Sequence, residues 1–490
     1  MTKSSHPLFL ATLAALIAAS VATTTVLAGS EPAAESSGTR SRDRSAAKSS
    51  DSVAGAGQTL NFPNRPIGSL FTANAETVES PLQFGPAQGK VIGPKDRLLL
   101  YKPSDAVIAD PTLLKQVPPN IVGLDLYNLN VSDEFVRKLL MFHDLRYLRL
   151  SETEISDGVI SNISQFPKLN TLLLNHCDIK GNDLDKLARS HELVSLVLVS
   201  TACSPETLAK LKAIQSLKRL NLSRTRMNDD CMKSLGKLVN LTHLNISKTR
   251  LSDSGMSYVQ GLKGLRQLAI SGNGITDAGL KNVGALPNLE QLECLGNGPY
   301  TKVGITALKS CTALRVLDIS RNELNDDALK ALVAACPRLT NLILSETKTA
   351  TDKGFENLGR LSAIKYLVLS NTSAGDGTAR ALAKARTLTS LDLQHTAVTN
   401  KGVALLASLP QLSAVVFSDN PKITDEAAKA ISASSSVRSL SFDSTGITDA
   451  SLPMLMKMHN LTGLVVLETK ISTKGFAELK RALPGCAIAY

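Results

Sequence analysis

Tryptophan is absent from the 490-residue sequence, and aromatic residues make up only 4% of it. This aromatic content is low for a compact globular core, and it is typical of an interior filled by stacked leucine and isoleucine. A chain of this length also exceeds one ordinary globular core, so it forms either several domains or one elongated repeat array. The hydrophobic fraction of 43% and the charged fraction of 20% are typical of a folded protein.

Sequence motifs of catalysis and metal binding are missing as well. The sequence has no Cys-x-x-Cys pair, no His-Glu-x-x-His motif and no glycine-rich phosphate loop. Its histidines are scattered, and no nucleophile–base pair or carboxylate pair stands apart from the repeat pattern described below. We therefore predict a protein that is not an enzyme and that needs neither a cofactor nor a metal.

Positive charge is in excess but is not concentrated. The formal net charge is +11, spread over the whole chain, whereas nucleic-acid binders usually gather Lys and Arg in a stripe with aromatic residues between them. The sequence therefore predicts no specific nucleic-acid partner.

Residues 1–28 have the pattern of an export signal. Lys3 precedes an apolar stretch from Pro7 to Ala28, which ends in small residues before Gly29. This pattern predicts a signal peptide, and the length of the stretch leaves an uncleaved membrane anchor as the alternative. No cysteine lies near the exit, which argues against a lipoprotein, and no other run approaches the roughly 20 apolar residues of a transmembrane helix.

Two further segments precede the repeats. Residues 29–59 are dominated by Ser, Ala and Gly, which predicts a disordered linker. Residues 60–120 contain a strand-like run at Arg97–Tyr101 among Pro and Gly turns. Because the first unit of a repeat array exposes its core, we expect residues 60–120 to form an N-terminal cap. Residues 484–490 break the pattern at the other end and are expected to form a C-terminal cap.

One phrase recurs between these caps, over residues 121–483. Leu145, Leu148 and Leu150 have the spacing L-x-x-L-x-L, and counting from Ile121 gives about 15 such units of 24 or 25 residues. A fixed period in this range with this phrase predicts an α/β fold: a right-handed leucine-rich-repeat solenoid, or horseshoe, with a concave parallel sheet and short convex helices. The three apolar residues point inward from a short strand, and the residues between them face solvent.

Two polar positions in each unit have structural roles. The ninth is mostly Thr or Asn, as at Thr153 and Asn273, and we expect it to hydrogen-bond the backbone of the neighbouring unit. A Ser/Thr-Asp pair such as Thr276-Asp277 follows a few residues later and predicts a helix N-cap with an acid in the first turn. Recurrence at one position of the repeat favours this reading over a catalytic or metal-binding one.

The phrases at Leu268–Leu280 and Ala335–Leu339 resemble the leucine-rich-repeat superfamily, in its ribonuclease-inhibitor-like branch with cysteine-containing repeats. The resemblance covers about three quarters of the chain. It departs from that branch in having the helix-end cysteine only at Cys311 and Cys336. The branch often implies a ubiquitin-ligase substrate adaptor, but no F-box-like segment is found and a signal peptide is, so the arrangement is more similar to exported bacterial leucine-rich-repeat proteins.

These features predict a non-catalytic scaffold that is exported to the periplasm, the cell surface or the medium and binds its ligand on the concave face. The alternative is a membrane-anchored structural protein of the cell envelope. The expected partner is a protein or a polyanionic surface polymer, with membrane contact only through an uncleaved N-terminal segment.

The most charged sector of the predicted concave face is net basic, which would attract an acidic partner. Its candidate ligand-binding residues are Lys218, Arg219, Arg224, His243, Lys248, Arg266, Glu293, Asp318 and Arg321. A solvated face without a ligand is the competing reading. Sectors on either side place apolar residues at solvent-facing strand positions and are a second candidate for a protein contact: Leu173, Val197, Val199, Ile343 and Val368.

Overall fold

The computed structural model describes residues 59–73, 81–94 and 97–490. These residues divide into two compact units, 59–245 and 246–490, and each unit is a solenoid of strands alternating with short helices. The predicted signal peptide and all of the predicted linker except Thr59 lie outside the described residues.

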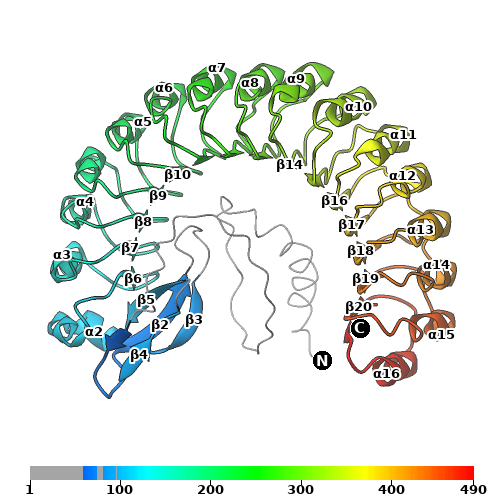
Figure 1. Ribbon diagram of the computed structural model, residues 1–490, viewed down its shortest axis with the longest axis horizontal. Helices are drawn as coiled ribbons and strands as arrows, with labels where there is room; N and C mark the ends of the chain where they lie inside the picture. The colour runs from blue at the N-terminus through cyan, green and yellow to red at the C-terminus, as the bar shows by residue number, and fades with distance from the viewer. Residues whose placement is uncertain (1–58, 74–80, 95–96) are drawn as a thin grey trace. The chain divides into compact units, whose positions relative to one another are not determined.

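The N-terminal unit contains a ladder of parallel strands in unbroken chain order. Figure 1 shows its helices along the outer side of these strands. The strands are β5 (Leu98–Pro103), β6 (Gly123–Asp125), β7 (Tyr147–Arg149), β8 (Thr171–Leu173), β9 (Ser195–Val197), β10 (Arg219–Asn221) and β11 (His243–Asn245). The helices are α2 (Asp105–Ala109), η1 (Pro111–Gln116), α3 (Asp133–Lys138), η2 (Leu139–Met141), α4 (Gly158–Ile163), η3 (Leu184–Arg189), α5 (Pro205–Leu208), η4 (Ala209–Ala213) and α6 (Asp229–Leu235).

The segment predicted as the N-terminal cap has two parts. Strand β5 lies inside it but pairs in parallel with β6, so the ladder begins one strand before Ile121. On its other edge β5 pairs antiparallel with β2 (Gly68–Ala73), which also pairs with β3 (Leu82–Pro86). A separate antiparallel pair joins β1 (Thr59–Asn61) to β4 (Lys90–Ile92). The edge of the parallel ladder is therefore covered by antiparallel strands, which satisfies its backbone groups.

The C-terminal unit repeats the same ladder. Its strands are β12 (Gln267–Ala269), β13 (Gln291–Glu293), β14 (Val316–Asp318), β15 (Asn341–Ile343), β16 (Tyr366–Val368), β17 (Ser390–Asp392), β18 (Ala414–Val416), β19 (Ser439–Ser441), β20 (Gly463–Val465) and β21 (Ala487–Ala489). Its helices are α7 (Asp253–Met256), η5 (Ser257–Gly261), α8 (Asp277–Val283), α9 (Lys302–Ala307), η6 (Leu308–Ser310), α10 (Asp326–Ala335), α11 (Asp352–Phe355), η7 (Glu356–Arg360), α12 (Asp376–Leu382), α13 (Asn400–Leu406), α14 (Asp425–Ile431), η8 (Asp449–Ser451), α15 (Leu452–Leu455) and α16 (Thr473–Ala482). The predicted solenoid of parallel strands and short helices is confirmed in both units.

The central residue of each three-residue strand points into the core. Leu172, Leu268 and Leu317 are examples, and each is fully buried. Because side chains alternate along a strand, the first and third residues lie on the opposite side, away from the helices. We call this side the strand face.

Asparagine at the ninth position links neighbouring repeats as predicted. The side-chain Nδ2 of Asn273 donates to the carbonyl oxygen of Ile246 in the preceding repeat at 2.8 Å, and its Oδ1 accepts from the backbone N–H of Thr249 at 2.7 Å. Threonine does less, because its hydroxyl donates to a carbonyl three residues back in its own repeat, as from Thr153 to Leu150 at 2.6 Å. The prediction is therefore correct for Asn and wrong for Thr, whose single hydroxyl donates to a carbonyl oxygen of its own repeat and has no second donor for the backbone of the neighbouring one.

The Ser/Thr-Asp pairs connect repeats as well as capping helices. Thr276 caps α8 through a bond to the N–H of Ala278, as predicted, and Asp277 accepts from the N–H of Thr301 in the next repeat at 2.9 Å. At Thr351 no capping bond forms within its own helix, and the hydroxyl donates only to the preceding Asp326, at 2.7 Å. The aspartate of one repeat therefore holds the first turn of the next helix.

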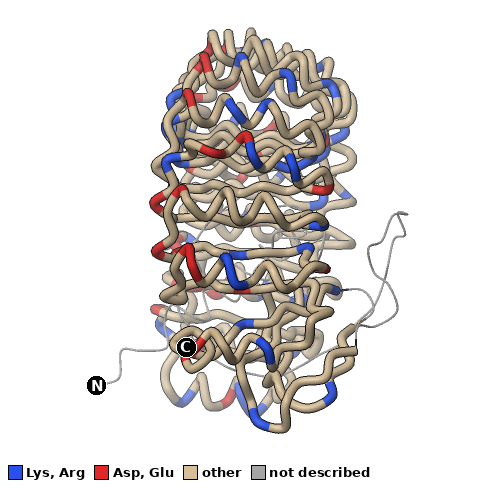
Figure 2. The backbone as a smooth tube through the Cα atoms, turned by 90° about the vertical axis from the view of Figure 1, so that its left-hand side faces the viewer, with Lys and Arg blue, Asp and Glu red and all other residues tan. Residues whose placement is uncertain are grey.

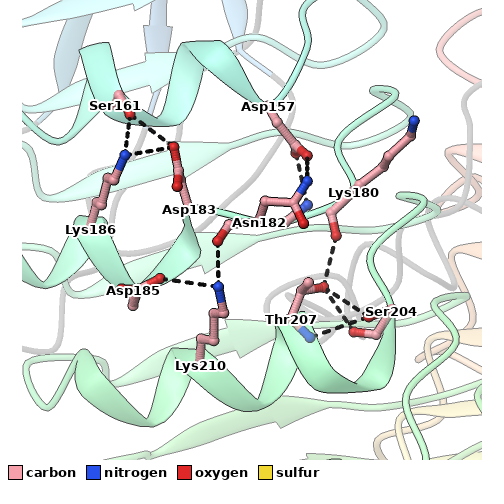
Figure 3. Close-up of polar contacts among 11 residues, drawn as sticks. Asp157, Ser161, Lys180, Asn182, Asp183, Asp185, Lys186, Ser204, Thr207 and Lys210 are labelled. Carbon is pink, nitrogen blue, oxygen red and sulfur yellow. Dashed lines mark hydrogen bonds and ion pairs between the residues drawn. The ribbon is translucent and has the colours of Figure 1, made fainter.

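The repeat at residues 178–190 lacks this pair and uses other polar contacts (Figure 3). Asp157 accepts from the N–H of Gly181 at 2.8 Å and from the Nδ2 of Asn182 at 2.7 Å. Lys186 donates to Ser161 and Asp183, and the hydroxyl of Thr207 donates to the carbonyl oxygen of Lys180 at 2.7 Å. Gly181 has φ +86°, a conformation that a side chain rarely adopts.

The seven cysteines form no disulfide, and all of them lie in the part of the chain that the structure describes. Six are buried and Cys486 is half-buried. Burial raises the pKa of the Cys311 thiol to about 11 and that of Cys336 to about 12, so both stay protonated at neutral pH. Neither thiol is bridged, and both are buried.

A glycine in the first helical turn gives the preceding aspartate its space. Gly402 lies in α13, and a Cβ atom there would lie 2.5 Å from Oδ1 of Asp376, the atom that accepts from the N–H of Gly402 at 3.0 Å. We expect Gly402→Ala to lower the free energy of unfolding by about 1–3 kcal/mol through overpacking, although alanine is otherwise the better helix former. Urea denaturation followed by circular dichroism measures the change.

Gly485→Ala is the matched control, because a Cβ atom at Gly485 would have no atom within 4 Å. It should leave the urea midpoint within experimental error of the wild type. Equal midpoints for the two variants would show that the aspartate does not require glycine at this turn.

Candidate ligand-binding surface

The residues of the predicted basic sector are divided between the two units. Some lie near the beginning of a strand and others near its end. Lys218, Arg219, Arg224 and His243 belong to the N-terminal unit. Arg219 and His243 are the first residues of β10 and β11 and are half-buried on the strand face. Lys218 precedes β10 and is exposed, whereas Arg224 follows the strand in an exposed turn.

The remaining five candidates belong to the C-terminal unit. Arg266 is exposed just before β12, while Lys248 and Arg321 are exposed in turns. Only Glu293 and Asp318 lie on strands, as the third residues of β13 and β14. The prediction that the set lies at strand positions is therefore wrong for Lys218, Arg224, Lys248, Arg266 and Arg321.

The turns that hold three of these residues form a repeated feature that the sequence reasoning missed. Arg224, Lys248 and Arg321 have φ values of 58°, 54° and 57°, and the equivalent residue of the other repeats is also left-handed. A left-handed residue other than glycine is uncommon, so its recurrence shows that the turn geometry is imposed by the ladder. The available signal was a polar or glycine residue at the same place in every unit.

The basic side chains around β12–β14 are engaged within the protein. Nη1 of Arg266 lies 3.0 Å from Oε1 of Glu290, and Nη2 of Arg321 lies 2.7 Å from Oε1 of Glu346. Nη1 of Arg315 donates to the carbonyl oxygens of Thr312 and Leu314. Exposed ion pairs contribute little to stability, but these do neutralise the local positive charge.

Glu293 and Asp318 have a different environment. They are register partners on adjacent parallel strands, so their Cα atoms are about one strand spacing apart, roughly 4.8 Å. Burial raises the pKa of Glu293 from its usual 4.5 to about 7, with a smaller increase from the charge of Asp318, and it also raises the pKa of Asp318. The strand face of the C-terminal unit therefore carries two carboxylates that are costly to ionise.

Gln291 adds an amide to this pair. It is the first residue of β13, and its Nε2 donates to Oε1 of Glu293 at 2.7 Å. Only 3% of Gln291 is exposed, and its Oε1 accepts no hydrogen bond from any residue that the structure describes. Gln267 is the register partner of Gln291 on β12, and its Oε1 also accepts no hydrogen bond from the described residues.

Apolar residues cover much of the rest of this strand face. Tyr366, Val368, Val416, Val465 and Leu467 form a cluster, with Ile343 packed against it and partly buried. A third carboxylate, Asp392, lies among these strands, and its burial raises its pKa to about 6. The predicted apolar sector around Ile343 and Val368 is therefore present, but most of its side chains are already buried.

The N-terminal unit has a comparable apolar cluster on its strand face. The predicted residues Leu173, Val197 and Val199 lie in it with Tyr147 and Leu100. Nearby, the guanidinium of Arg149 stacks on the ring of Tyr127 at 4.1 Å and lies 3.6 Å from Oδ2 of Asp125.

No metal centre is found within residues 59–73, 81–94 and 97–490, where no three His, Cys, Asp or Glu side chains converge on one point. The helices of these same ranges are also too short or too polar to span a bilayer. On the helix side of the N-terminal unit, basic and acidic residues are interspersed along the repeats (Figure 2).

Sequence comparison finds two models of the leucine-rich repeat in this chain. One matches residues 215–275, and the other matches residues 310–333 and 384–407. A search of curated protein sequences finds no match.

Solved structures share the fold at low identity. A leucine-rich-repeat protein of Leptospira interrogans is 19% identical with a TM-score of 0.51, and the match covers 80% of this chain and 99% of that one. The structure of the TLR13–ssRNA13 complex is 18% identical with a TM-score of 0.54, and the match covers 80% of this chain and 65% of that one. The structure of the mouse RP105/MD-1 complex is 18% identical with a TM-score of 0.51, and the match covers 73% of this chain and 69% of that one. Together with the repeat models and the strand ladders, these matches show that the chain contains leucine-rich repeats and has the leucine-rich-repeat fold.

Proposed function

We propose that this protein is a non-catalytic scaffold that binds another protein through the strand face of its repeats. The observation that carries the proposal is the composition of that face in the C-terminal unit, where half-buried carboxylates adjoin an apolar cluster. Partly exposed apolar side chains such as Ile343 beside orienting polar groups are typical of protein interfaces. Two structures of the same fold hold macromolecular partners, MD-1 and ssRNA13, which supports binding as the class of function.

The helix side is a weaker candidate for the binding surface. Its Ser, Thr, Asp and Gly residues are committed to contacts between successive repeats, as at Asp376 and Gly402. The strand face has no such duty, so its side chains are free to vary with the partner.

The test of the proposed face compares two apolar substitutions. Ile343 is half-buried on the strand face, and Val303 is 67% exposed on the helix side in α9. With a partner captured by the wild-type chain and then purified, we expect Ile343→Ser to weaken binding about fivefold or more, because it removes apolar contact area. Val303→Ser should bind as the wild type does.

Isothermal titration calorimetry on both variants measures the difference. Loss of binding in Val303→Ser with no change in Ile343→Ser would assign the partner to the helix side and refute the proposal.

The carboxylate of Glu293 should cost the free protein stability at high pH. Its pKa of about 7 in the folded chain exceeds its usual 4.5, so the folded state binds the extra proton and stability falls as the pH rises from about 4.5 to 7. We expect Glu293→Gln to unfold with a free energy roughly 1–3 kcal/mol above the wild type at pH 8. The difference should vanish near pH 4, where the glutamate is neutral in both states.

Urea titrations at pH 4 and pH 8 check this, with the exposed Glu323→Gln as the control that changes the same charge. A Glu293→Gln chain less stable than the wild type at pH 8 would contradict the assignment of a desolvated carboxylate.

We further propose that the protein acts outside the cytoplasm, on the strength of the signal-like sequence at residues 1–28. If Ala28–Gly29 is the cleavage junction, N-terminal sequencing of exported protein should begin at Gly29. Intact Met1 on membrane-bound protein would instead favour the anchored envelope protein.

A further inference from the structure

The carboxylates of Glu293 and Asp318 face the same side of two adjacent strands of the C-terminal unit. They are the third residues of β13 and β14 and are paired in register, while the residues before them, Leu292 and Leu317, are fully buried in the core. Side-chain alternation therefore places both acids together on the strand face.

No cation of the described chain forms an ion pair with these acids, although the charge of Arg321 partly offsets the rise in the pKa of Asp318. Glu293 accepts from Gln291, and Oδ1 of Asp318 accepts from the N–H and the hydroxyl of Ser320, at 3.0 and 2.7 Å. The ion pairs found among residues 59–73, 81–94 and 97–490 include neither carboxylate. Arg266 and Arg321, the basic residues on either side, are bound to Glu290 and Glu346.

A second observation, independent of the acids, also indicates an external donor. Gln291 is almost wholly buried beside Glu293, yet its Oε1 accepts no hydrogen bond from the described residues. A buried acceptor without a partner costs about 1–3 kcal/mol. The same holds for Oε1 of Gln267 on the next strand, so unmet acceptors line this part of the face.

We infer that this part of the strand face, formed by Gln291, Glu293 and Asp318, binds a basic side chain, a lysine or arginine, of the protein partner. The inference rests on the proposed function, since it names the chemistry that the partner presents to that face. It differs from the expectation of an acidic partner, which was drawn from basic residues that now prove to lie at the strand ends or to be paired.

Three acceptors fit a cationic side chain. An ammonium group has three N–H donors, and a guanidinium has five in a planar fork, so either can bond two carboxylates and one amide oxygen together. A positive charge placed there also offsets the burial that raises the pKa of both acids. The net charge of +11 repels cations in general, so capture of one depends on these local groups.

The experiment uses the full chain and a fluorescein-labelled pentalysine peptide, with the peptide acetylated at all five lysines as the control probe. Fluorescence anisotropy at 20 mM and 150 mM salt measures binding. We expect pentalysine to bind and the acetylated peptide not to bind. Glu293→Gln/Asp318→Asn should weaken pentalysine binding about tenfold or more, since each lost bond is charge-assisted.

The matched control is Glu323→Gln/Asp327→Asn, which removes the same two charges from exposed positions outside the strand face. It should bind pentalysine within about twofold of the wild type. The inference is overturned if the wild type does not bind pentalysine, or if the two double variants bind it equally well.

A second variant supplies the cation from the chain itself. Ile343 is the register partner of Asp318 on β15, so Ile343→Lys places an ammonium beside the carboxylates. We expect it to raise the thermal midpoint at pH 8 and to abolish pentalysine binding. A lower midpoint together with undiminished pentalysine binding would overturn the inference.

Failure of the inference and failure of the proposed function give different results. If Ile343→Ser weakens binding of the captured partner but Glu293→Gln/Asp318→Asn does not, the proposed scaffold function is supported and the inferred basic side chain is refuted. If the partner is indifferent to both substitutions, the strand face is not its binding surface.

Discussion

The structure depends on one constraint, the backbone hydrogen bonding of each short strand to the strand of the next repeat in the same register. Leu268 pairs with Leu292 and Leu292 with Leu317, so a separation of 24 or 25 residues becomes one strand spacing. A three-residue strand is too short to be stable alone, and a single repeat cannot bury its leucines. Every other feature of the molecule follows from keeping successive repeats in this register.

The helix side maintains the register by a second set of contacts. Asp376 accepts from Thr399 and from Gly402 in the following repeat, and the glycine leaves room for the carboxylate. This arrangement explains why an aspartate and a glycine recur in helices where alanine would have the higher propensity. The recurring spacing of these residues within the chain therefore reflects structure.

On the strand face the same register determines which charged side chains lie next to each other. Placing Glu293 beside Asp318 brings two carboxylates within one strand spacing, in surroundings that already disfavour their ionisation. A folded protein stabilises most buried charges by pairing them. Here the nearby Arg266 and Arg321 pair with Glu290 and Glu346, so neither forms an ion pair with Glu293 or Asp318.

The sequence by itself determined the repeat, the direction of the leucines and the solenoid class, because a 24- or 25-residue period with L-x-x-L-x-L has only one way to bury its apolar residues. It also named Glu293 and Asp318 among the candidate ligand-binding residues. Only the tertiary structure showed that Arg266 and Arg321 are paired, that Arg224 and Lys248 lie in left-handed turns, and that Gln291 is buried without an acceptor bond. Pairing, turn geometry and desolvation depend on residues one repeat away, which neighbour each other in space but not in sequence.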